Sequence, residues 1–240
     1  MDSRPYYTKF VFIFDLDDTL YKEIDFVRSA FSHIDRLLVA DYGYKEGLAR
    51  QILNNAYDNG INPFNELNAA LEKACIKIPD AIKWMVDEYR FHIPQIKLTA
   101  DAAEMLPRLR YESFDMYIIT DGRSITQRNK IRALGLNRFV PNENIFISEE
   151  IGYDKTNPAA FNEIYSRYFY MSPLNLQDIM FVFVGDNPAK DFVVGNTMGY
   201  PTFMLMDDGR NIHKQNVKVP KEYKPMHKVK TIKNILDILI

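Results

Sequence analysis

The sequence predicts an α/β protein with a mostly parallel sheet and an inserted all-helical segment. Three observations carry this prediction. Apolar segments of strand length alternate with helical patterns over residues 97–240. The apolar segment at 8–14 leads directly into a cluster of aspartates, and residues 22–96 show helical periodicity without a strand pattern. Strands that alternate with helices usually pair in parallel through right-handed crossovers.

The first predicted strand, at 8–14, ends in three acidic residues. A continuous apolar run of this length is typical of a central strand that is buried on both faces. Asp15, Asp17 and Asp18 follow at its carboxyl end, where open α/β sheets bind ligands. Carboxylates this close repel one another, so that one is protonated or a cation is present. The alternative is a solvated acidic turn after a strand.

The helical insertion is predicted from the spacing of its apolar residues. Phe26, Ala30, Ile34 and Leu38 recur at the interval of one helix face. Similar patterns continue to residue 86, with breaks at 59–60 and 62–63, where Asn-Gly and Asn-Pro pairs stand. A long helical stretch inside an otherwise alternating chain indicates a separate helical module.

The remaining elements follow in order after the insertion. We predict strands at 114–120, 144–148, 179–185 and 201–206, and helices at 100–110, 124–134, 158–169 and 189–198. A final short helix at 232–240 is expected to dock on the core. Residues 214–233 carry seven lysines against one glutamate. We interpret them as a solvated surface loop rather than a nucleic-acid patch, because arginines and interleaved aromatic residues are sparse.

Two further segments place polar groups after predicted strands. Thr120, Asp121 and Gly122 end one strand just ahead of a helix, where free backbone N–H groups and a small hydroxyl form an anion site. Lys155 precedes a helix that begins with Pro158, and a lysine there neutralises a bound phosphate as a point charge. Taken singly, the first feature is better explained as an ordinary strand-to-helix turn and the second as a surface lysine.

The apolar strand at 179–185 ends in a second acidic segment. Asp186 and Asp191 bracket the start of a predicted helix, with Asn187 beside them. Their oxygens suit a hard cation such as Mg²⁺. Asp191 alone is also explained as an acid in the first turn of a helix, which the helix dipole favours.

Bulk composition excludes several classes of protein. A hydrophobic content of 47% supports a real core, and a net charge of −2 gives no global attraction to nucleic acid. No apolar stretch is long enough to cross a bilayer, and residues 1–8 lack a signal-peptide pattern, so we expect a cytoplasmic protein. Cys75 is the single cysteine, which excludes an intramolecular disulfide. We expect its thiol to be buried and inert.

The order of these features resembles the haloacid dehalogenase superfamily. A DxDxT motif, a strand ending in Thr, a lysine and a GDxxxxD motif each follow their own strand. The stretches TDGRSITQRNKIRALGL and ISEEIG are similar to parts of its small-metabolite phosphatases, including nucleotidases and acylneuraminate phosphatases. The resemblance implies a Rossmann-like core formed by residues 1–21 and 97–240. It also implies a helical cap of the C1 type at 22–96.

The resemblance also implies roles for individual residues. Asp15 would be the nucleophile that forms an aspartyl-phosphate, and Asp17 would be the general acid and base. The phosphate-binding residues would be Thr120, Asp121, Gly122 and Lys155. Mg²⁺ would be held by Asp15, Asp186 and the backbone carbonyl of Asp17, with support from Asn187 and Asp191.

The function implied is Mg²⁺-dependent hydrolysis of a small phosphorylated metabolite, a nucleotide or a sugar phosphate. A phosphomutase and a catalytically idle phosphate-binding protein remain alternatives, whereas Asp17 argues against a dehalogenase, because a halide needs no proton. In this family the lysine usually precedes a proline directly, but here Thr156 and Asn157 intervene. The expected partner is a small-molecule phosphate ester, without nucleic acid or membrane, and the chain is expected to be a monomer or a homodimer.

Overall fold

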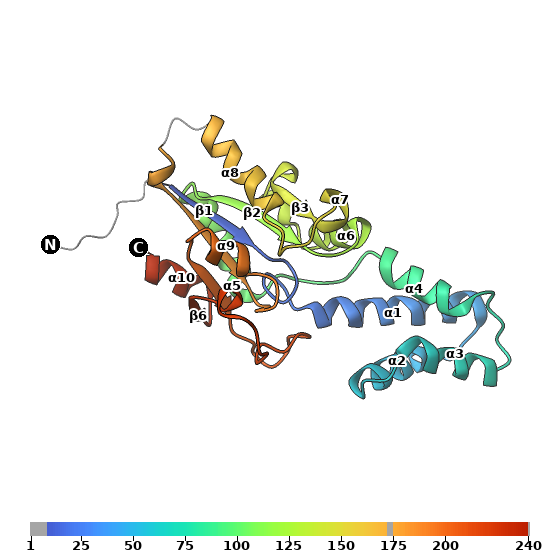
Figure 1. Ribbon diagram of the computed structural model, residues 1–240. Coiled ribbons are helices and arrows are strands. Elements are labelled where there is room, and N and C mark those ends of the chain that lie inside the picture. The colour runs from blue at the N-terminus through green and yellow to red at the C-terminus, as the bar shows by residue number, and fades with distance from the viewer. Residues whose placement is uncertain (1–8, 172–174, 240) are drawn as a thin grey trace.

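The computed structural model describes residues 9–171 and 175–239. It contains a six-stranded sheet in the order β3-β2-β1-β4-β5-β6, and every neighbouring pair is parallel (Figure 1). The strands are β1 Lys9–Phe14, β2 Asp115–Thr120, β3 Ile145–Ile147, β4 Ile179–Gly185, β5 Thr202–Leu205 and β6 His227–Val229. The parallel sheet with its helices confirms the predicted fold class. Residues 8 and 240, which we placed in the first strand and the last helix, lie outside the described residues.

Strand β1 is buried on both faces because its side chains alternate between two hydrophobic clusters. Phe12 and Phe14 join the cluster beneath α5 (Ala100–Tyr111), α6 (Ser124–Ala133) and α10 (Ile232–Leu239). Val11 and Ile13 join the cluster beneath α8 (Ala159–Met171) and α9 (Val193–Thr197). Helices therefore cover both faces of the sheet, as a continuous apolar strand requires.

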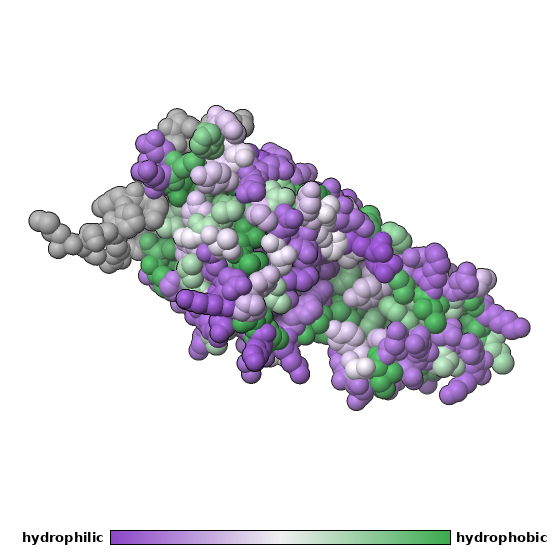
Figure 2. Space-filling view, viewed as in Figure 1, coloured by the Kyte–Doolittle hydropathy of each residue, from purple (hydrophilic) through white to green (hydrophobic). Residues whose placement is uncertain are grey.

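Residues 22–96, all of them described, contain helices and no strand. The helices are α1 Glu23–Tyr42, α2 Leu48–Asp58, α3 Pro63–Lys73 and α4 Ala81–Phe91. They extend away from the sheet (Figure 1) and share a hydrophobic cluster of their own, built around Phe31, Leu53, Leu67 and Met85. We call α1–α4 the helical unit. On the face shown in Figure 2, hydrophilic residues cover much of the sheet-containing part and much of the helical unit.

The predicted breaks inside the helical unit have local causes. The side chain of Asn62 accepts hydrogen bonds from the N–H groups of Phe64 and Asn65, and Pro63 takes the first helical position of α3, where its missing N–H costs nothing. Gly43 ends α1 in the left-handed conformation, with φ of 63°. Asn62 and Pro63 stand at a break that the sequence pattern indicated, whereas the helix end at Gly43 was not predicted.

Three expectations about the fold were wrong. The predicted helix at 189–198 is only α9, because the Asp191 carboxylate accepts the N–H groups of Asp186 and Asn187 and holds the preceding residues in a turn. The lysine-rich segment contains β6, a three-residue edge strand in which only Val229 is buried, so it carries no apolar pattern. Cys75 is exposed, because α3 ends at Lys73 and Cys75 occupies a left-handed turn with φ of 59°.

The other predicted elements agree with the structure to within a few residues. The last helix, α10, docks on the core through Ile232, Ile235 and Leu236. Over residues 9–171 and 175–239, each helix is too short or too polar to cross a bilayer.

Candidate active site

The candidate site lies at the carboxyl edge of the three central strands. Asp15 follows β1, Asp186 follows β4 and Thr120 ends β2. The backbone N–H of Asp15 donates to the carbonyl of Val184 at 2.9 Å, which continues the pairing of β1 with β4 as far as the first acid. Parallel pairing brings these three residues to one edge, although they are far apart in the sequence.

Lys155 joins two of the acids. Its ammonium lies 2.6 Å from an oxygen of Asp15 and 2.6 Å from an oxygen of Asp191. The hydroxyl of Thr19 donates to the other oxygen of Asp15 at 3.1 Å. Burial lowers the pKa of Lys155, but the two carboxylates outweigh it and hold that pKa well above its usual value. Lys155 is therefore a fixed positive charge beside Asp15.

The two residues inserted before Pro158 are absorbed in a turn. The carboxylate of Asp154 accepts the N–H and the hydroxyl of Thr156, and the side chain of Asn157 accepts the N–H of Ala159. Lys155 reaches Asp15 despite the insertion.

Asp15, Asp186 and Asp191 each offer one carboxylate oxygen to a group in which these three oxygens lie within 4.8 Å of one another. Burial, followed by repulsion from the neighbouring acids, raises the pKa of Asp186 to about 9. Burial also raises the pKa of Asp15 to about 7, although the Lys155 ammonium opposes this shift. A buried set of oxygen ligands with this much unrelieved repulsion fits a hard divalent cation such as Mg²⁺.

The structure places the predicted supporting residues around this group. Asn187 donates its N–H to Asp191, and its side-chain oxygen accepts the N–H of Ala189. The side chain of Asn187 therefore stabilises the turn after β4. Asp191 supplies one oxygen to the three-acid group, while the side chain of Asp17 contacts other residues.

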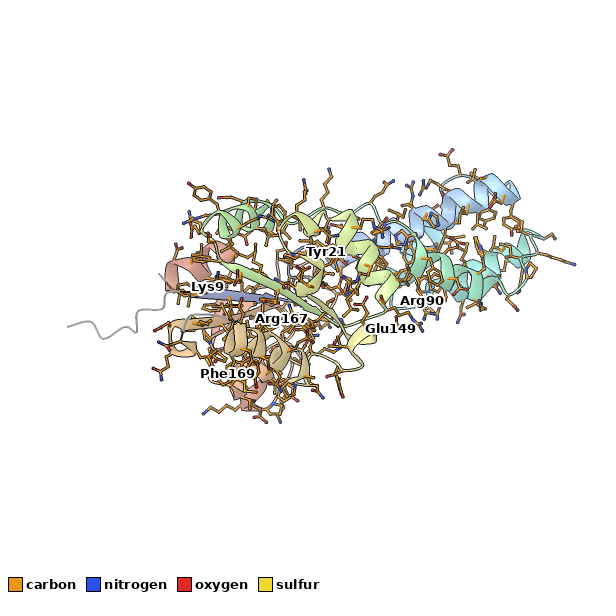
Figure 3. The ribbon with its side chains drawn as sticks, turned by 90° about the horizontal axis from the view of Figure 1, so that it is seen from above. Lys9, Tyr21, Arg90, Glu149, Arg167 and Phe169 are labelled. Carbon is orange, nitrogen blue, oxygen red and sulfur yellow. The ribbon has the colours of Figure 1, made fainter. Side chains whose placement is uncertain are left out.

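Asp17 is held by three donors. Lys130 donates to Oδ1 at 2.7 Å, Gln127 donates to Oδ2 at 2.8 Å, and the hydroxyl of Tyr21 also donates to Oδ1. Burial raises the pKa of Asp17, but the Lys130 ammonium and these hydrogen bonds hold it below its usual value. Tyr21 lies between the sheet and the helical unit (Figure 3).

The predicted phosphate-binding residues after β2 are largely engaged with protein groups. The hydroxyl of Thr120 accepts from Gln127 at 2.6 Å. The carboxylate of Asp121 accepts the N–H of Lys155 and the ammonium of Lys190. The N–H of Gly122 donates to the hydroxyl of Ser148 at 2.9 Å. The carboxylate of Asp121 thus holds the loop that carries Lys155 against the end of β2.

These residues surround a hollow of about 110 Å³. The predicted residues in its lining are Asp15, Asp17, Thr120, Asp121, Lys155, Asp186 and Asn187. Its lining also includes Glu23, Lys190 and His213. Sequence analysis missed Glu23, Gln127, Lys130 and Lys190. For Gln127 and Lys130, the sequence offered one signal that could have identified them. They are three residues apart, which places two polar side chains on one face of a helix.

A loop after β5 connects the site to the helical unit. Asn211 donates to Asp186 at 3.0 Å and accepts from Lys22 at 2.7 Å. The N–H of Ile212 donates to Asp18, and the side chain of Ile212 packs against the helical unit. Arg210 pairs with Asp25 on α1. We call residues 207–215 the strap.

Comparison with known proteins identifies the family. A family model described as haloacid dehalogenase-like hydrolase matches residues 12–205. This match covers well over half of the chain, so the chain belongs to that family, and the resemblance predicted from the motifs is confirmed.

Individual relatives share about a quarter of their aligned residues with this chain. Glyceraldehyde 3-phosphate phosphatase of Methanocaldococcus jannaschii is 26% identical over 200 residues, which cover 81% of this chain and 83% of that protein. The Bacillus subtilis HAD-hydrolase YfnB is 26% identical over 239 residues, covering 95% and 94%. The magnesium-bound crystal structure of YfnB, described as revealing interdomain movement, has a TM-score of 0.59 at 23% identity, with 96% and 98% covered. At that identity the structural comparison shows the shared fold.

Proposed function

We propose that this chain is a Mg²⁺-dependent phosphatase that hydrolyses a small phosphorylated metabolite through an aspartyl-phosphate. The observation that carries the proposal is the contact of Lys155 with both Asp15 and Asp191. It lies beside a hollow that Asp15, Asp17, Lys155 and Asp186 all line. Phosphatase activity of the Methanocaldococcus relative supports the reaction type.

In the first half-reaction, an oxygen of Asp15 attacks phosphorus and the bond from phosphorus to the leaving oxygen breaks. A carboxylate is a competent nucleophile for such a covalent step. Both Asp15 and the phosphate ester are anionic, so their charges must be cancelled. Lys155 contributes one positive charge, and Thr120 offers a hydroxyl to the phosphoryl oxygens. Asp17 gives a proton to the departing alkoxide. The negative charge of the bound phosphate raises the pKa of Asp17 against the effect of the Lys130 ammonium, which allows Asp17 to hold that proton.

In the second half-reaction, water attacks the phosphorus of the aspartyl-phosphate. Asp17 takes a proton from this water, and the bond between Asp15 and phosphorus breaks to regenerate the carboxylate and release phosphate. Asp15, Asp186 and the carbonyl of Asp17 would hold Mg²⁺, which supplies charge neutralisation for the transferring group when bound. Asp191 supports that site by fixing the turn after β4.

The domain boundaries are part of the same proposal, with a core at 1–21 and 97–240 and a cap at 22–96. The two connections run side by side, because Tyr21 bridges Leu98 and the N–H of Thr99 donates to Leu20 at 3.0 Å. Adjacent entry and exit points suit a hinge, and the movement described for YfnB is consistent with it.

The size of the hollow favours a small substrate. Pockets for drug-sized ligands occupy roughly 300–1,000 Å³, whereas this hollow measures about 110 Å³. We therefore expect short-chain sugar phosphates to be hydrolysed better than nucleotides.

The test is phosphate release from a panel of monophosphates, including glyceraldehyde 3-phosphate, ribose 5-phosphate and uridine monophosphate, with Mg²⁺ and after EDTA. Mg²⁺-dependent release is expected, fastest for the short sugar phosphate. Turnover that appears only after addition of a bisphosphate would favour a phosphomutase instead. An absence of turnover with all substrates would favour a binding protein.

A further inference from the structure

We propose that Lys130 and Gln127 are positioning residues that orient Asp17 so that its Oδ2 carries the transferred proton. The inference rests on the proposed function and deepens it. Both residues come from α6, three positions apart and therefore on the same face of the helix.

The contacts account for nearly all of the hydrogen-bonding capacity of Asp17. A carboxylate offers about four lone-pair directions, two on each oxygen. Lys130 and Tyr21 occupy both directions on Oδ1, and Gln127 occupies one on Oδ2. Among the described residues, one direction on Oδ2 is left for a proton that passes to or from substrate.

Gln127 fixes this oxygen relative to the phosphate-binding residues. Its side-chain nitrogen lies 2.8 Å from Asp17, 2.6 Å from Thr120 and 3.0 Å from the carbonyl of Asp121, so its two N–H groups are shared among three acceptors. The side chain of Gln127 is 1% exposed. A Cβ on Gly122 would lie 3.3 Å from Gln127, so a glycine here leaves room for the side chain.

Lys130 is buried more deeply than a lysine needs to be for a surface ion pair. It is 3% exposed, and its ammonium lies 4.5 Å from the centre of the Phe26 ring. Replacing a buried ion pair by apolar residues of similar size is often neutral or stabilising. Stability alone therefore does not explain a lysine here, whereas control of the Asp17 orientation does.

Lys130 also connects Asp17 to the helical unit. Its ammonium lies 3.8 Å from the carboxylate of Glu23, in the first turn of α1. Phe26, whose ring contacts this ammonium, is on the same helix. The orientation of the acid thus depends on residues from the core and from the start of the helical unit.

The test compares two substrates that differ in their need for a proton. Glycerol 3-phosphate releases an alkoxide that must be protonated, whereas p-nitrophenyl phosphate releases a stable phenolate. The comparison uses the rate of the first turnover, because hydrolysis of the aspartyl-phosphate needs Asp17 whichever substrate formed it. In Lys130→Met we expect this rate to fall about 100-fold for glycerol 3-phosphate, the lower range for loss of general acid catalysis. For p-nitrophenyl phosphate we expect the first-turnover rate to fall less than about tenfold, because the acid contributes less to the departure of a phenolate.

Asp17→Asn should show the same substrate dependence, and Lys130→Met should add little to it in the double variant. Arg132→Met is the matched control, because it removes an exposed cation two residues away on α6. If Lys130→Met does not fold, Gln127→Met gives the same comparison. Equal losses in the first-turnover rates of both substrates, or losses that multiply with those of Asp17→Asn, would overturn the inference.

The outcomes separate the two proposals. A wild-type protein that releases no phosphate from either substrate overturns the proposed function and the inference with it. A wild-type phosphatase that is sensitive to Asp17→Asn but gives equal losses for Lys130→Met on both substrates retains the function and refutes the positioning role.

Discussion

Asp15 combines burial with a fixed positive partner, and the positive partner suits the proposed role of Asp15 as the nucleophile. It is 6% exposed and contacts Lys155 and Thr19. We predict that Asp15→Asn keeps the fold but lowers kcat more than about 10³-fold, because an amide is a poor nucleophile.

This loss should be measured as phosphate release beside a thermal unfolding curve. Asp41→Asn is the matched control, since Asp41 is an exposed aspartate on α1. A variant at Asp15 that keeps a tenth of the wild-type kcat would contradict the nucleophile assignment.

His92 should make stability depend on pH. Burial, with help from His33, Arg36 and Lys130, lowers its pKa from 6.5 to about 4, and its Nε2 has no hydrogen-bond partner among the described residues. Between pH 6.5 and 4 the unfolded chain therefore binds a proton that the folded chain does not. The folded state loses up to about 1.4 kcal/mol per pH unit through this residue as the pH falls.

Replacement of His92 by glutamine removes this dependence. Urea unfolding at pH 7 and pH 5 should show that the wild type loses about 2 kcal/mol more than His92→Gln between the two values. Parallel pH profiles for the two proteins would show that His92 titrates normally in the fold.

At the scale of elements, the ends of β1 and β4 bring together carboxylates that repel one another, and the proposed Mg²⁺ would relieve this repulsion. We predict that Mg²⁺ raises the Tm of the wild type, because a ligand that binds only the folded state stabilises it. Asp186→Asn should abolish this response. It should also raise the Tm without metal, by about 2–4 °C for each kcal/mol of repulsion removed.

Thermal unfolding with and without excess Mg²⁺ checks both effects. Asp237→Asn, at an exposed position on α10, should respond to Mg²⁺ like the wild type. An equal Mg²⁺ response in Asp186→Asn would exclude Asp186 as a ligand.

Elements with strong periodicity were predictable, and those defined by side-chain contacts were not. The apolar runs of β1 and β4 indicated buried central strands, and the acids after them follow from parallel pairing. β6 was missed because three residues at a sheet edge bury too little to leave a pattern. The start of α9 was misplaced because the Asp191 carboxylate, and not local propensity, sets the turn.

The site was predictable only where motif and strand end coincide. Asp15, Asp186 and Lys155 lie close together as the motifs indicated. Gln127 and Lys130 were missed because a helix pattern shows which face is buried but not which distant carboxylate that face meets.

At the scale of the whole molecule, the helical unit should limit which substrates reach the acids. We predict that replacing residues 22–96 with a short Gly-Ser linker raises activity on a nucleotide relative to a three-carbon phosphate, because the site loses the walls supplied by α1.

The ratio of kcat/KM for uridine monophosphate to that for glyceraldehyde 3-phosphate measures this change, with circular dichroism to verify the remaining sheet. An unchanged ratio would mean that the helical unit does not select substrates by size.

The strap limits how the helical unit can be exchanged between this chain and its relatives. Residues 21 and 97 look like natural joints for exchanging one cap for another between relatives. However, the strap also contacts this region from more than a hundred residues downstream. Asn211 bonds to Lys22, Arg210 pairs with Asp25, and Ile212 packs against the helical unit. A grafted cap would meet a strap shaped for a different partner, and the mismatch would be transmitted through Asn211 to Asp186. A working chimaera should therefore inherit the helical unit, both of its connections and residues 207–215 from one parent.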